Sequence, residues 1–68
     1  MNTQEIKQLQ RVIDGKTYDA RILRKALNST NNLEYKICLK AEIANKSTFE
    51  SRRTLDLFAC ELQQGISA

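Results

Sequence analysis

The apolar residues of this chain recur at helical spacing in separate segments, and no proline interrupts them. Turn residues divide the chain into segments at residues 3–13, 17–28, 33–44 and 48–64. The first segment carries one apolar stripe, made of Ile6, Leu9, Val12 and Ile13. Asn2 and Glu5 have the spacing of a capping box, and Asp14-Gly15 is typical of a helix end. The sequence therefore predicts a helix over residues 3–13.

The second segment predicts an amphipathic helix with a basic outer face. Thr17 can cap this helix, whose apolar arc consists of Tyr18, Ile22, Leu23, Ala26 and Leu27. The opposite arc carries Arg21, Arg24 and Lys25. Three cations on one helix face can contact phosphates or an acidic protein, or they can simply be solvated.

The third segment supports two interpretations. Apolar residues alternate with polar ones, as in a half-buried strand, at Leu33, Tyr35, Ile37, Leu39, Ala41 and Ile43. Leu, Glu, Lys and Ala dominate the segment and favour helix, and Asn31 with Glu34 has the spacing of a capping box. A helix here carries two apolar stripes, one of Leu33, Ile37, Ala41 and Ala44, the other of Tyr35, Leu39 and Ile43. We favour the helix because a lone strand would leave its edges unpaired.

The fourth segment, residues 48–64, predicts the longest helix. Ser47 with Glu50 forms a capping box, and Gly65 is expected to end the helix. The core stripe consists of Leu55, Phe58, Ala59 and Leu62. A second apolar set, made of Phe49, Leu57 and Cys60, falls on the opposite side. One small core does not require both sets.

The fold class expected from these segments is all-α, a compact domain of four short helices covering residues 1–68 as a single domain. The alternative is an α+β domain, a helix–β-hairpin–helix with strands near residues 18–27 and 33–43. A chain of 68 residues buries only about 60% of the surface that its unfolded form exposes, so we expect marginal stability.

The composition argues against catalysis and against a bound metal or cofactor. The chain has no histidine, and its carboxylates are scattered singly. Cys38 and Cys60 have no metal-ligand spacing and indicate a reducing compartment rather than a secreted domain. Gly15-Lys16-Thr17 lacks the earlier glycine of a phosphate-binding loop. With a polar start and no long apolar run, we expect a cytoplasmic protein that is not an enzyme.

Three classes of function remain for such a chain. The first is a small accessory protein that binds another protein, modulates or inhibits it, and forms a homodimer. Its expected contacts are the spare apolar residues Tyr35, Leu39, Ile43, Phe49 and Leu57. The second is a basic DNA-binding regulator that uses Arg21, Arg24 and Lys25. The third is a structural subunit of a larger assembly, as in some phages. The net charge of only +3 places protein binding first.

Overall fold

The computed structural model describes residues 1–67, and its regular structure is entirely helical over that range. The helices are α1 (Thr3–Ile13), α2 (Ala20–Asn28), α3 (Leu33–Ile43) and α4 (Phe49–Ser67). The all-α prediction is therefore confirmed. The α+β alternative is wrong, because residues 18–27 and 33–43 form no strand.

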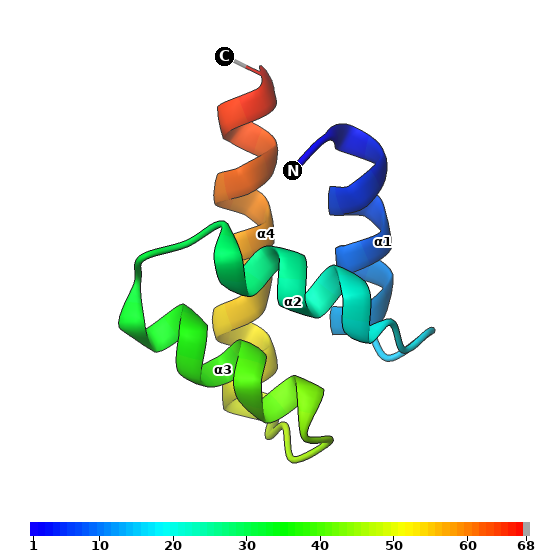
Figure 1. Cartoon of the computed structure of the whole chain (residues 1–68), viewed down its shortest axis with the longest axis vertical. Helices are drawn as coiled ribbons and strands as arrows, with labels where there is room; N and C mark the ends of the chain where they lie inside the picture. Colours follow the sequence, from blue (N-terminus) through cyan, green and yellow to red (C-terminus); the bar gives the residue numbers. More distant parts are fainter. Residues whose placement is uncertain (68) are drawn as a thin grey trace.

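The helices form two antiparallel pairs that cross each other (Figure 1). α1 packs along α4, and α2 packs against α3, while α3 also contacts α4 and α1 contacts α2. Each helix contributes one leucine without exposed surface to the common core, namely Leu9, Leu23, Leu39 and Leu55. The core thus joins residues from both ends of the chain.

Two turns of the same kind end α1 and α3. Gly15 has φ +77° and Asn45 has φ +58°, both in the left-handed region that glycine and asparagine tolerate best. After each turn residue, the next amide donates to a carbonyl five residues earlier: Lys16 to Arg11 at 2.9 Å, and Lys46 to Ala41 at 2.8 Å. This pattern is a Schellman motif. The predicted stop at Asp14-Gly15 is confirmed.

The N-terminal cap residues agree with the sequence prediction only in α1. There Asn2 and Glu5 form the expected capping box. α2 is capped by Asp19 rather than Thr17, because the Asp19 carboxylate accepts hydrogen bonds from two amides of the first turn. α3 is capped by Asn32, one residue later than expected.

Both predicted boundaries of α4 are also wrong. Thr48 and Ser51 exchange backbone-to-side-chain hydrogen bonds of 3.1 and 2.9 Å, and so replace the expected box of Ser47 and Glu50. The Ser47 hydroxyl instead donates to Glu42. α4 continues through Gly65, because this glycine does not adopt the positive φ that ends a helix.

The structure reverses the two stripes of α3. Tyr35 and Leu39, predicted to be spare surface residues, belong to the core, and Ile43 is half-buried against it. The Tyr35 ring lies 4.8 Å from that of Phe58 between ring centres, and its hydroxyl donates to Glu61 at 2.9 Å. These contacts with α4 fix the inward face of α3.

Candidate functional site

The outer face of α4 is apolar and exposed. Phe49 keeps 76% of its surface and Leu57 63%, and Cys60 is exposed on the same side of the helix. Arg53 lies between Phe49 and Leu57 in the sequence, and its guanidinium is 6.0 Å from the centre of the Phe49 ring. The expectation that Phe49 and Leu57 fall outside the core is confirmed. We call Phe49, Arg53, Leu57 and Cys60 the α4 outer face.

A second exposed apolar pair lies on α3, on the stripe opposite the one that was predicted to be spare. Leu33 is 71% and Ile37 60% exposed. The sequence contained this stripe, but both faces of α3 are apolar and nothing in the segment itself distinguished the inner one. Leu33 and Ile37 therefore take the place of Tyr35 and Leu39 as the apolar surface of this helix.

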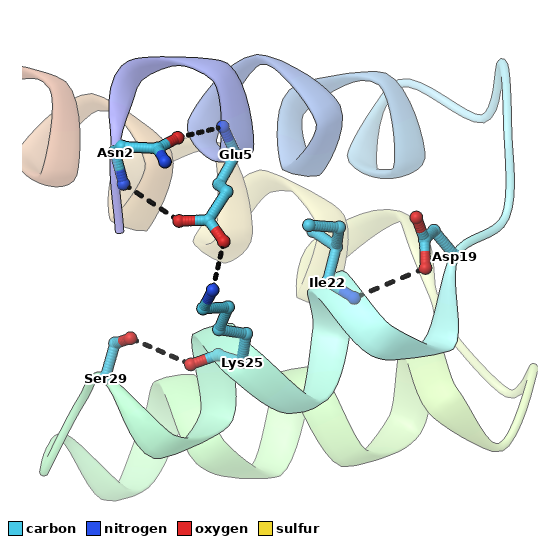
Figure 2. Close-up of polar contacts among 6 residues, drawn as sticks. All are labelled: Asn2, Glu5, Asp19, Ile22, Lys25 and Ser29. Atoms are coloured by element: carbon cyan, nitrogen blue, oxygen red, sulfur yellow. Dashed lines mark hydrogen bonds and ion pairs between the residues drawn. The ribbon is translucent and has the colours of Figure 1, made fainter.

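The predicted basic face of α2 is partly used within the fold. Lys25 pairs with Glu5 of α1, whose carboxylate also accepts a hydrogen bond from the Asn2 amide (Figure 2). These contacts hold the pKa of Glu5 below its usual value, with the Lys25 hydrogen bond as the largest cause. Arg21 and Arg24 remain exposed. Of the three cations, Lys25 thus already has an acidic partner in the fold.

A groove of about 650 Å³ lies between the outer side of α1 and the turn into α2. Lys7 and Arg11 line it from α1, and Thr17, Tyr18 and Asp19 line it from the turn. Tyr18 was expected on the apolar arc of α2, but it precedes that helix and is 56% exposed. Because the groove joins two segments across the Gly15 turn, spacing along the sequence did not reveal it.

Two buried polar groups on α3 have structural partners. Glu42 accepts a hydrogen bond from Ser47 and lies 3.7 Å from the Arg52 guanidinium, measured between Oε2 and Nε. The hydrogen bond to Glu61 raises the pKa of Tyr35. Both groups hold α3 to its neighbours rather than forming a reactive site.

The two thiols differ in their surroundings. Cys38 is buried, and burial raises the pKa of its thiol, which keeps it protonated and unreactive. Cys60 is exposed on α4. Within residues 1–67, no three side chains of His, Cys, Asp or Glu come together as metal ligands would.

Comparisons with family models, with curated proteins and with solved structures found no match to this chain. None of the helices in the described part of the chain has the length and apolar character needed to cross a membrane.

Proposed function

We propose that the protein is a non-catalytic accessory protein that binds another protein through the α4 outer face and thereby modulates or inhibits it. The observation that supports this proposal is the exposure of Phe49 and Leu57 on one side of the longest helix. Burying a side chain of this size stabilises a complex by roughly 1.5–3 kcal/mol. In the monomer Phe49 and Leu57 stay exposed, so the fold does not gain this free energy.

The make-up of the face describes the partner surface that it fits. Arg53 stands between the two apolar side chains, and aromatic residues and arginine are enriched in interfaces. Glu50 and Asp56 flank them on the exposed side of the helix. The complementary surface is therefore apolar at its centre and of mixed charge at its edge.

A second copy of the chain meets this description. In an antiparallel α4 pair with its two-fold axis at Leu57, Arg53 of one copy faces Glu61 of the other, because both lie four residues from the axis. Leu57 then packs on its own symmetry mate. We include this homodimer in the proposal, as a state in which a second copy competes with the other protein for the same face. A structural subunit of a larger assembly would use the same face.

A DNA-binding regulator that uses the basic face of α2 is the weaker candidate. Lys25 is exposed but pairs with Glu5, which leaves Arg21 and Arg24 as the cations of that face available to a ligand. Phosphate binding usually draws on several cations at once, and α2 has no aromatic residue that could add base stacking to the two that remain.

The test compares two double variants in a pull-down from nuclease-treated extract. Phe49→Ser with Leu57→Ser removes the α4 outer face, and Leu33→Ser with Ile37→Ser removes the exposed pair of α3 as a matched control. We expect the first variant to lose the proteins that the wild type retains and the second to keep them. Equal capture by both variants, or loss of all capture after nuclease treatment, would contradict the proposal.

Light scattering tests the homodimer separately. The wild type is expected to show the mass of two chains at high micromolar concentration, and Leu57→Asp the mass of one. Ile37→Asp, a charge placed on the other exposed apolar surface, should leave the dimer intact. A wild-type monomer at that concentration would contradict the dimer without touching the binding of other proteins.

A further inference from the structure

The groove between α1 and the α1–α2 turn and the hollows beside it gather cations that form no ion pair within residues 1–67. Lys7 and Arg11 lie one helical turn apart on the outer side of α1 and both line it. Lys16 lines an adjoining hollow beside Thr17, and Arg21 lines another beside Gln8. The ion pairs within residues 1–67 are Lys25 with Glu5 and Arg52 with Glu42, so they include none of these four cations.

The acids near the groove are already bound elsewhere. One oxygen of Asp19 accepts hydrogen bonds from the amides of Arg21 and Ile22, at 3.0 and 3.3 Å, where the positive end of α2 stabilises its charge. The Gln10 amide donates to both Asp14 and Asp56 at 3.0 Å. Among the charged residues that line the groove, Lys7 and Arg11 outnumber Asp19, so the lining carries a net charge of +1 (two cations minus one acid).

Tyr18 lies between the groove and the adjoining hollow that Lys16 lines, and it forms a fixed aromatic surface there. Its hydroxyl donates to the Ile43 carbonyl at 2.9 Å, which ties the far end of the ring to the end of α3. More than half of the surface of the residue is nevertheless exposed. Tyr18 lines both the hollow with Lys7 and Arg11 and the hollow with Lys16. A ring held at one end and open to solvent loses little freedom when another ring stacks on it.

We propose that this groove binds single-stranded nucleic acid, with Lys7 and Arg11 on the phosphates and a base stacked on Tyr18. Proteins that bind single strands combine a basic groove with aromatic stacking surfaces. A duplex presents phosphates, but its bases are stacked on each other and offer no face to Tyr18. The site is separate from the α4 outer face, so this inference does not depend on the proposed protein binding.

The first test measures the binding of a short fluorescent single strand of mixed sequence to two variants of equal charge. Lys7→Gln with Arg11→Gln and the control Lys36→Gln with Lys40→Gln each remove two cations four residues apart on one helix, and each lowers the net charge from +3 to +1. We expect the groove variant to lose at least about tenfold in affinity, and its slope of log affinity against log salt to fall by about 1.4, or about 0.7 per phosphate contact. The control is expected to stay within about threefold of the wild type, with an unchanged slope.

The second test separates stacking from charge. Tyr18→Ala is expected to lower the affinity by roughly 5- to 150-fold without changing the salt slope, as loss of one stacked base would. Tyr18→Phe keeps the ring but loses the hydrogen bond to Ile43, so it is expected to lose less affinity than Tyr18→Ala. Circular dichroism melts establish that each variant is folded before binding is measured.

Three outcomes would overturn the proposal. One is no detectable binding of the single strand by the wild type at low salt. Another is equal binding of the duplex of the same sequence with no effect of Tyr18→Ala, which would show charge attraction alone. The third is tighter binding of a glutamate-rich peptide than of the single strand, which would indicate an acidic protein as the ligand.

Discussion

α2 and α3 lie against each other in the fold, yet their sequences specify their inner faces to different degrees. In α2 the residues that enter the core are Ile22, Leu23 and Ala26, as the apolar arc predicts, and charged residues cover the other side. In α3 apolar side chains occur on both sides, and the face with Leu33 and Ile37 remains outside. One apolar arc defines how a helix packs, whereas two leave the choice to its neighbours.

Contacts with α4 and with the turn after α3 determine which face of α3 packs inward. Tyr35 gains a ring contact with Phe58 and a hydrogen bond with Glu61 only when it faces inward. The inward position of Glu42 depends on its hydrogen bond from Ser47 and its proximity to Arg52. A buried carboxylate without such partners would be strongly unfavourable. The orientation of α3 is thus a property of the packed molecule rather than of the segment.

The largest expected effect comes from removing the ring against which α3 packs. Phe58→Ala is expected to lower the free energy of unfolding by about 3–5 kcal/mol, because it removes a buried ring and leaves a cavity beside Tyr35. That is a large share of the stability of any small domain. Urea denaturation measures it. A variant that unfolds within a few degrees of the wild type on heating would show that this contact does not hold the core together.

A pair of truncations on α3 tests the reversed stripes directly. Leu39→Ala is expected to cost about 2–5 kcal/mol of unfolding free energy, since Leu39 has no exposed surface. Ile37→Ala, two positions away and mostly exposed, is expected to stay within about 0.5 kcal/mol of the wild type. Both values come from the same denaturation experiment. Similar losses for the two variants would mean that both stripes of α3 are buried in solution.

The start of α2 gives a smaller and equally specific effect. Asp19→Ala removes the acceptor of two amide hydrogen bonds and is expected to cost about 1 kcal/mol of unfolding free energy. Thr17→Ala serves as the control, because Thr17 is exposed and lies before the cap. It should change stability by less than about 0.5 kcal/mol. A larger loss of unfolding free energy in Thr17→Ala than in Asp19→Ala would mean that Thr17 caps α2, as the sequence predicts.

Local signals predicted the helices themselves and less of their detail. Helical spacing and turn residues located all of the helices, and the Asn2 cap and the Gly15 stop were predicted correctly. Caps shifted by one or two residues where neighbouring polar side chains compete, as do Asn31 and Asn32. The local sequence does not show which of two such side chains bonds to another helix instead, as Ser47 does to Glu42 of α3.

The candidate sites likewise divide into features that one segment predicts and features that arise only when segments pack together. Phe49 and Leu57 could be predicted to be exposed because α4 has one clear core stripe that excludes them. The groove could not be predicted, because Tyr18 meets Lys7 and Arg11 only after the turn at Gly15 folds the chain back. The ion pair of Lys25 in α2 with Glu5 in α1 could not be predicted from the sequence either.

The smallest expected effect concerns that last pair and depends on pH. Lys25 and Asn2 hold the pKa of Glu5 below that of a glutamate in the unfolded chain, so the charged carboxylate stabilises the fold fully at pH values above the unfolded-state pKa. The contribution is lost as the pH falls through the lowered, folded-state pKa. Glu5→Gln keeps the capping-box hydrogen bond and removes the charge, so its unfolding free energy should decline less steeply than that of the wild type in this acidic range. Lys25→Met should show the same reduced slope, and Lys40→Met should not. Identical pH profiles for the wild type and Glu5→Gln would mean that the pair does not link α1 to α2 in solution.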